Sequence, residues 1–245
     1  KVYDIASSKL SHGLNCEVSN QPEEKVKPIL KEKLAAYKAS MITRVERAGI
    51  EVKYNTPATV EAVKAINPKG VFIATGGIPI VPNLPGINGT NVTTAEAVLT
   101  GKAEAKGNVV VIGGGVTGME TAETIASKGN KVTLIEMTKS IGRGLYRSVI
   151  VDYQMRFAKM GIEVKTLERL AAVNEGSVTL INSITSQASQ IPCDTVVLAL
   201  GVRPNDAIVD EFEKEFDEVI VLGDANKSGR IVEATFDALG RASTF

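Results

Sequence analysis

The sequence is poor in the residues that usually carry redox or metal chemistry. Its 245 residues include two cysteines, Cys16 and Cys193, and one histidine, His12. Without a C-x-x-C pair the chain has no dithiol relay, and two cysteines cannot supply the four thiolates of an iron–sulfur cluster. A single histidine without an evident partner is more often a loop or surface residue than an acid–base catalyst. Two distant cysteines are typical of a reducing compartment, so we expect a cytoplasmic protein.

The sequence also lacks a charge excess and a long apolar run. Lysine plus arginine equals aspartate plus glutamate at 28 each, so charge gives no reason to expect nucleic acid or an anionic membrane as partner. No segment approaches the roughly 18 apolar residues of a membrane-crossing helix. The hydrophobic share of 44% and the charged share of 23% are ordinary for a globular protein. This composition does not fix the oligomeric state and is compatible with a homo-oligomer.

Strand and helix patterns alternate along the chain, which predicts an α/β protein with largely parallel sheets. The expected strands are 1–5, 50–54, 71–75, 108–112, 131–136, 162–166, 195–200 and 219–222, and the expected helices are 25–48, 58–66, 94–100, 116–128, 147–160 and one from about 231. Residues 169–192 predict a short β-meander, and the Pro/Gly-rich residues 78–90 predict a linker. A similar strand ending recurs at 71–76 and 196–201. We therefore predict two Rossmann-like three-layer domains, one inserted in the other.

A nucleotide-binding fingerprint follows the strand at 108–112. Residues 113–118 read Gly-Gly-Gly-Val-Thr-Gly and satisfy G-x-G-x-x-G. In this motif Gly113 makes the tight turn, Gly115 lets the backbone approach a pyrophosphate, and Gly118 lets the helix pack on the strand. The phosphates then meet the free N–H groups and the positive dipole end of the helix.

Glu136 ends the second strand of this βαβ unit, close to the spacing of about 20 residues at which the motif places an acidic residue. A carboxylate there accepts hydrogen bonds from a free ribose 2′-hydroxyl and repels a 2′-phosphate, so NADH is favoured over NADPH. Lys139 and Arg143 lie a little downstream and leave room for a weaker preference. The residues that we predict to bind NAD(H) are Gly113, Gly114, Gly115, Val116, Thr117, Gly118, Glu136 and Gly201.

Three further segments each end a strand in a turn of small residues: 74–77, 199–205 and 219–225. Together with the fingerprint they resemble the flavoprotein pyridine nucleotide oxidoreductases, which carry an FAD domain with an NAD domain inserted. More narrowly, the segments 8–15 and 49–55, with the helix between them and residues 65–71, resemble the C-terminal half of the NADH:flavin oxidoreductases. That branch includes 2-enoate reductases, 2,4-dienoyl-CoA reductases and trimethylamine dehydrogenase.

The resemblance implies a division into three segments. Residues 1–104 would be the first part of an FAD-binding domain, 105–200 the inserted NAD(H)-binding domain, and 201–245 the last part of the FAD-binding domain. It also implies that Asp224 binds the ribitol chain of the flavin, with Gly223 allowing close approach. The residues implied for FAD are Asp4, Thr75, Gly76, Gly223 and Asp224.

Two departures from the family concern FAD. The chain starts, without methionine, at what resembles the second strand, so the first strand and its own glycine fingerprint are absent, and Ser11-His12 replaces a Gly-Gly pair. We therefore expect a piece of a longer polypeptide that binds FAD when intact and has an incomplete FAD site here. Either Asp4 or Ile5 would face the FAD adenosine ribose. The implied partner is an N-terminal barrel of the same polypeptide, which holds FMN and a four-cysteine cluster in the family.

Two functions follow from these patterns. The first is the NADH-oxidising electron-entry module of a flavin-dependent oxidoreductase, whose final substrate the barrel domain would set. The alternative is a truncated module that binds NAD(H) without flavin and is inactive in isolation. Hydride transfer between nicotinamide and flavin needs orientation more than acid–base side chains. We therefore predict no catalytic residue and no metal ligand.

Overall fold

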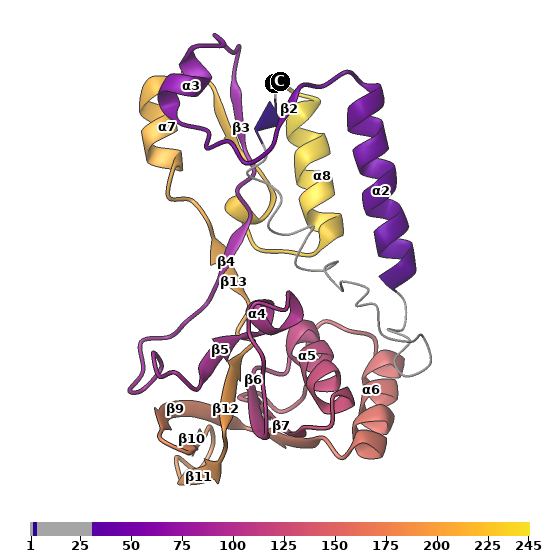
Figure 1. The fold of residues 1–245 in the computed structure, drawn as a ribbon, viewed down its shortest axis with the longest axis vertical. Coiled ribbons are helices and arrows are strands. Elements are labelled where there is room, and N and C mark those ends of the chain that lie inside the picture. The colour runs from indigo at the N-terminus through magenta and orange to yellow at the C-terminus, as the bar shows by residue number, and fades with distance from the viewer. Residues whose placement is uncertain (1, 4–30) are drawn as a thin grey trace. The chain divides into compact units, whose positions relative to one another are not determined.

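The computed structural model describes residues 2–3 and 31–245, which divide into two compact units. Residues 79–201 form one, which we call the inserted unit. Residues 2–3, 31–78 and 202–245 form the other, the flanking unit. Both consist of strands and helices in alternation, with parallel strand pairs and one small antiparallel meander (Figure 1). The predicted α/β class with Rossmann-like parallel sheets is confirmed.

The inserted unit is built on a parallel sheet with the strand order β5-β12-β6-β7-β8. Its strands are β5 (Val92–Thr94), β6 (Asn108–Ile112), β7 (Lys131–Glu136), β8 (Glu163–Thr166) and β12 (Thr195–Leu198). Its helices are α4 (Ala95–Leu99), α5 (Val116–Ser127) and α6 (Arg147–Met160). The antiparallel meander consists of β9 (Glu168–Asn174), β10 (Ser177–Asn182) and β11 (Ala188–Pro192). Strand β5 was not predicted from the sequence; the other elements follow the predicted strands, helices and meander with small shifts at their ends.

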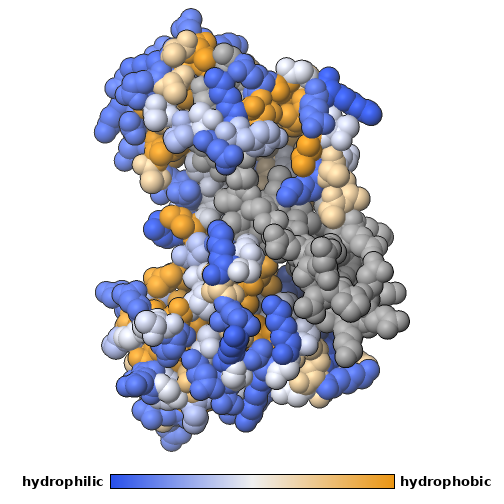
Figure 2. All heavy atoms as spheres, in the orientation of Figure 1, coloured by the Kyte–Doolittle hydropathy of each residue, from blue (hydrophilic) through white to orange (hydrophobic). Residues whose placement is uncertain are grey.

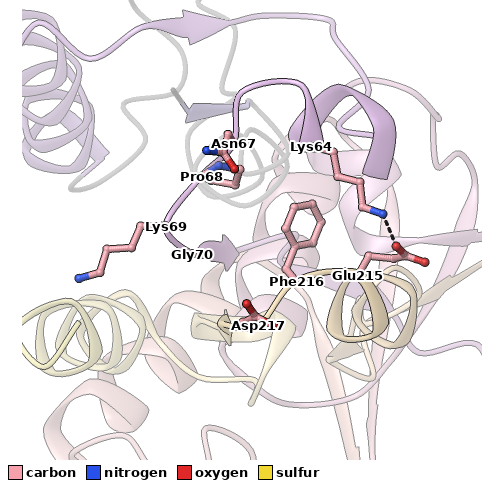
Figure 3. Close-up of a pocket in the computed structure, with 8 residues that line it drawn as sticks. All are labelled: Lys64, Asn67, Pro68, Lys69, Gly70, Glu215, Phe216 and Asp217. Atoms are coloured by element: carbon pink, nitrogen blue, oxygen red, sulfur yellow. Dashed lines mark hydrogen bonds and ion pairs between the residues drawn. The ribbon is translucent and has the colours of Figure 1, made fainter.

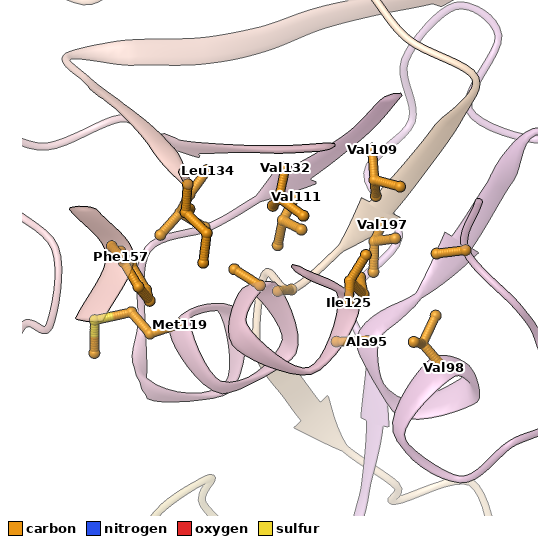
Figure 4. Close-up of a cluster of buried hydrophobic side chains, with 14 of the residues drawn as sticks. Ala95, Val98, Val109, Val111, Met119, Ile125, Val132, Leu134, Phe157 and Val197 are labelled. Carbon is orange, nitrogen blue, oxygen red and sulfur yellow. The ribbon is translucent and has the colours of Figure 1, made fainter. Parts of the chain in front are cut away.

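Side-chain alternation along the central strands creates the three layers of this unit. In β6, Val109 and Val111 face the helices and belong to the same buried cluster as Met119 of α5 (Figure 4), whereas Val110 and Ile112 face the meander. The two clusters are separate and both are almost fully buried. A continuous apolar strand with both faces covered is what a buried parallel sheet requires.

The segment predicted as a linker is instead packed against the inserted unit. Ile87 is buried beside the meander, and Val173 of β9 donates its N–H to the carbonyl of Pro85 at 2.9 Å. Gly86 has φ +74°, and a methyl group there would lie 2.8 Å from the carbonyl carbon of Val173. Glycine is needed here for its backbone angle and for lack of space. The Pro/Gly content around Gly86 thus marks a tightly packed loop, and the two units divide between Ile78 and Pro79, at the start of the predicted linker.

The unit boundary also differs from the predicted division at residue 105. Strand β5 pairs in parallel with β12 and forms an edge of the main sheet. Helix α4 packs into the same core through Ala95 and Val98. Residues 79–104 therefore belong with the inserted unit, because their hydrogen bonds and apolar contacts lie there.

The flanking unit contains two short parallel strand pairs, β1 with β2 and β3 with β14. Its strands are β1 (Val2–Tyr3), β2 (Val52–Lys53), β3 (Val71–Ile73) and β14 (Val219–Val221), and the connecting strands β4 (Gly77–Pro79) and β13 (Val202–Pro204) pair with each other. Its helices are α2 (Lys31–Arg47), α3 (Val60–Lys64), α7 (Val209–Glu215) and α8 (Ile231–Ala242), with a 3-10 turn η1 (Gly223–Ala225). Positions 25–30 of the predicted first helix lie outside the described residues.

Helix α7 was not predicted from the sequence. Its single buried residue, Phe212, joins Ile73 of β3 and Val60 and Val63 of α3 in the small core of the flanking unit. One buried side chain in an acidic segment gives no helical periodicity to read. Lys64 of α3 and Glu215 of α7 form an ion pair across this contact.

No residue of helix α8 is buried. Its apolar side chains Val232, Phe236 and Leu239 are exposed by 46%, 68% and 67%. On the face drawn in Figure 2, hydrophobic residues lie in small groups among hydrophilic ones. Among the described helices, none is both long and apolar enough to span a lipid bilayer.

Candidate functional site

The glycine fingerprint lies at the carboxyl end of β6, where the chain turns into α5. Gly113 donates its N–H to the carbonyl of Ile135 at 2.8 Å and has φ +110°, an angle that other residues rarely adopt. A methyl group on Gly113 would lie 3.0 Å from the carbonyl carbon of Ala199. The turn therefore requires glycine for both angle and space.

The other two fingerprint glycines have opposite surroundings. A methyl group on Gly118 would lie 3.0 Å from the carbonyl carbon of Gly113 and 3.3 Å from Cβ of Ala199, so the helix packs directly on the turn. A methyl group on Gly115, the N-cap of α5, would meet nothing within 4 Å. The N–H groups of Val116 and Thr117 belong to the first turn of the helix, where intrahelical acceptors are lacking. The open space at Gly115 lies beside the positive end of α5.

Glu136 is held firmly at the end of β7. Its Oε2 accepts the N–H of Gly114 at 2.7 Å, and its Oε1 accepts the N–H of Thr138 at 2.8 Å. Each carboxylate oxygen has a second lone pair, so further acceptor capacity remains. Lys139 and Arg143 are exposed in the loop that follows. The carboxylate is thus tied to the glycine loop, a bond that the sequence pattern did not reveal.

Gly201 follows the neighbouring strand β12. Because β12 pairs in parallel with β6, with Leu198 opposite Ile112, the carboxyl ends of the two strands meet. The structure therefore brings Gly201 to the edge of the sheet that carries the fingerprint, where its carbonyl accepts the N–H of Ile80 at 3.0 Å. Sequence reasoning missed Ala199, whose small side chain and backbone line the turn at Gly113. Its position just after a buried strand was the available signal.

The residues predicted for FAD that the structure describes occupy a comparable edge in the flanking unit. Thr75 and Gly76 follow β3, Gly223 and Asp224 follow β14, and Ile73 pairs with Val221 at the ends of these strands. Parallel sheets bind ligands at the carboxyl ends of their strands. Asp4 lies outside the described residues.

Two hydrogen-bonded turns form this second edge. Thr75 is buried and donates its hydroxyl to the carbonyl of Asn205, whose side-chain amide donates to the carbonyl of Thr75 at 3.3 Å. Asp224 is 5% exposed, and its Oδ1 accepts the N–H of Gly229 at 2.9 Å. Thr75 and Asp224 are therefore both held by hydrogen bonds between side chains and the backbone.

Helix α8 fixes the turn that carries Asp224. Asp237 of α8 accepts the N–H of Gly223 at 2.8 Å and pairs with Arg241 at 2.7 Å. The Arg241 guanidinium, and then the Gly223 N–H, lower the pKa of Asp237 below its ordinary value. Asp237 is a further residue that the sequence analysis missed.

Two surface pockets lie away from these edges. One, of about 210 Å³, is lined by residues just before β3 and β14, including Gly70 and Asp217 (Figure 3). The other, of about 490 Å³, is lined by Asn91 and Asp194, just before β5 and β12. Both are thus at the amino ends of parallel strands, opposite to the ends where such sheets bind nucleotides. In the first pocket, Lys64 is neutralised by its ion pair with Glu215.

Cys193 is the free cysteine among the described residues, and it is buried. Burial, and then the charge of Asp194, raise the pKa of its thiol. A buried thiol of raised pKa is a poor nucleophile at neutral pH. Cys193 therefore acts as a core side chain, packed beside Leu180 and Val196.

Known proteins share this arrangement. Residues 6–228 match the family model described as pyridine nucleotide-disulphide oxidoreductase. The chain is 32% identical over 212 residues to an NADH oxidase of Thermoanaerobacter brockii, which spans 83% of this chain and 32% of the relative. It is 33% identical over 178 residues to a bilirubin reductase of Mediterraneibacter gnavus, across 73% of this chain and 28% of the relative.

A solved structure extends the likeness to the fold. The structure of a 2-naphthoyl-CoA reductase in complex with 2-naphthoyl-CoA superposes with a TM-score of 0.81 at 28% identity, covering 94% of this chain and 33% of that one. The chain thus spans about a third of the length of the relatives it matches. The expected resemblance to the NADH:flavin oxidoreductases is confirmed. This chain is an FAD- and NAD(P)-binding module of flavoprotein oxidoreductases and belongs to the pyridine nucleotide-disulphide oxidoreductase family.

Proposed function

We propose that this chain is the electron-entry module of a flavin-dependent oxidoreductase, which binds NADH in the inserted unit for hydride transfer to FAD. The observation that carries the proposal is the open space at Gly115 beside the start of α5, with the fixed carboxylate of Glu136 at the end of the next strand. A pyrophosphate fits the first feature, because the free N–H groups and the helix dipole favour an anion. A ribose diol fits the second.

The residues of the inserted unit divide the work of holding NADH. Gly113 and Gly118 bring the turn and the helix together, and Gly115 leaves room for the phosphates. Val116 and Thr117 supply first-turn N–H groups. Glu136 would accept hydrogen bonds from the adenosine ribose and repel a 2′-phosphate, which favours NADH over NADPH. Gly201, at the adjacent strand end, would leave space along the extended cofactor.

The flanking unit would hold the flavin. Bound FAD would supply the two-electron acceptor for the nicotinamide hydride. Asp224 would bind the ribitol chain, and Thr75, Gly76 and Gly223 would form the small-residue turns beside it. The family likeness and the meeting of these turns at one strand edge support this assignment. Acid–base side chains are not needed, because the cofactors carry the chemistry.

We further propose that this module works with a partner domain of the same polypeptide that holds FMN and an iron–sulfur cluster. The relatives' greater length supports this, since each extends well beyond the segment that matches here. The relatives' names span bilirubin, cinnamate and NADH-oxidase activities, while the matched segment is common to them. The final substrate would therefore be set by the partner domain.

Two measurements on the purified chain test the proposal. NADH fluorescence enhancement should report binding. Replacing Glu136 with alanine should raise the Kd for NADH about tenfold or more, because charged hydrogen bonds contribute about 1.5–3 kcal/mol. The same change should lower the Kd for NADPH, because the repulsion of the 2′-phosphate is removed. A yellow flavin absorbance that NADH bleaches without oxygen would support the flavin role. A colourless protein that binds NADH would favour the module without flavin. Equal NADH affinity before and after the substitution would refute the ribose assignment.

A further inference from the structure

Gly114, the middle residue of the glycine triplet, is one of the predicted NAD(H)-binding residues but has no separate role in the G-x-G-x-x-G pattern, and it too is closely confined. Gly114 donates its N–H to Oε2 of Glu136 at 2.7 Å, and its carbonyl accepts the N–H of Gly142 at 2.8 Å. Both hydrogen-bonding groups of Gly114 are therefore used by residues 136–142, the segment that comprises the last residue of β7 and the loop after it. The glycine loop and this segment are joined at one residue.

The space around Gly114 is filled by the same segment. A methyl group on Gly114 would lie 2.9 Å from Cβ of Glu136, 3.0 Å from its Oε2 and 2.8 Å from Cγ2 of Ile141. Ile141 is 2% exposed, so it has little freedom to move aside. Any side chain at position 114 must therefore displace the Glu136 carboxylate.

We propose that Gly114 is a positioning residue that sets cofactor preference through Glu136. Its N–H fixes one carboxylate oxygen, and the Thr138 N–H fixes the other at 2.8 Å, so the carboxylate holds one orientation before the cofactor arrives. An acceptor that is already oriented loses less conformational freedom when it binds a ribose diol. The inference rests on the proposed NADH site.

The test is the ratio of the Kd values for NADPH and NADH, measured by fluorescence titration on the full chain. Gly114→Ala should raise the Kd for NADH about tenfold and change that for NADPH less than twofold, because only the ribose diol depends on the aligned carboxylate. In the Glu136→Ala background the same change at Gly114 should leave the ratio unaltered. A structural defect alone would weaken both cofactors equally and in both backgrounds.

Two further variants separate the outcomes. Gly240→Ala, in α8 with nothing within 4 Å, is the matched control and should leave both affinities unchanged. If Gly114→Ala does not fold, Glu136→Asp is measured in its place. This change keeps the charge but withdraws it from the Gly114 N–H, so it should also lower the ratio of the Kd for NADPH to the Kd for NADH. Failure of the parent chain to bind NADH would refute the proposed function. Binding with an unchanged ratio in Gly114→Ala, or in Glu136→Asp where that variant is used, would overturn this inference alone.

Discussion

Gly115 and Gly118 stand three residues apart in one loop–helix segment, yet a methyl group would meet opposite surroundings at the two positions. At Gly118 it would lie 3.0 Å from the carbonyl carbon of Gly113 and closer still to the oxygen, and 3.3 Å from Cβ of Ala199. At Gly115 it would meet nothing within 4 Å. Alanine at the two sites should therefore separate folding from cofactor binding.

The expected magnitudes follow from these contacts. Relieving the collision at Gly118 requires α5 to move away from the turn, and overpacking of this kind typically costs about 1–3 kcal/mol. Because the obstacle is backbone, we expect Gly118→Ala to lose about 3 kcal/mol. Gly115→Ala should lose about 1 kcal/mol or less, the difference between glycine and alanine at a helix N-cap. It should nevertheless weaken NADH strongly, because its methyl group would fill the space assigned to the pyrophosphate.

Urea unfolding followed by circular dichroism gives the stabilities, and NADH fluorescence gives the affinities. We expect the two variants to differ in stability more than in NADH affinity. Gly118→Ala would lose stability and, through its displaced helix, affinity as well, whereas Gly115→Ala would lose mainly affinity. Gly115→Ala with parental NADH affinity would refute the placement of the phosphates. Gly118→Ala with parental stability would refute the close packing of helix on strand.

Three further predictions concern packing and charge. Phe157→Ala, at a side chain 2% exposed in the helix layer, should lose about 3–5 kcal/mol in urea unfolding, and a loss below 1 kcal/mol would contradict the core assignment. Gly86→Ala should lose about 2–3 kcal/mol, measured in the same way, because the residue is left-handed and tightly packed, whereas a true linker would tolerate it. Arg241 and the Gly223 N–H lower the pKa of Asp237, so its contribution to stability is complete above about pH 4 and is lost as pH falls through the lowered value. Asp237→Asn should therefore flatten the stability profile below about pH 4, and a profile parallel to the parent would count against the contact.

The central βαβ unit could be predicted closely because several local signals agree there. Strand β6 is apolar on both faces, three glycines follow at fixed spacing, and α5 and β7 have the expected lengths. The structure begins β6 at Asn108 and ends β7 at Glu136, as the sequence predicted. Agreement between propensity, hydrophobic pattern and turn chemistry is what makes a segment readable without tertiary information.

Features that depend on distant contacts could not be predicted. The loop containing Gly86 has the composition of a linker, and only the carbonyl of Val173 on a remote strand shows that it is packed. Helix α7 contributes one buried phenylalanine, too few for a periodic pattern. The bond from the Gly114 N–H to Glu136 is equally invisible, because the motif describes which residues are small and does not describe where their N–H groups point.

The same residues hold the candidate cofactor site and the core of the inserted unit. Gly113 and Gly118 pack against Ala199, and Gly114 is enclosed by Glu136, so substitutions at these glycines must disturb the contact of helix, strand and loop. Gly115 is the exception among the fingerprint glycines, since a side chain there meets open space. A loss of NADH binding at Gly113, Gly114 or Gly118 can therefore arise through the fold and needs a second readout. A loss at Gly115 without loss of stability reports on the cofactor itself.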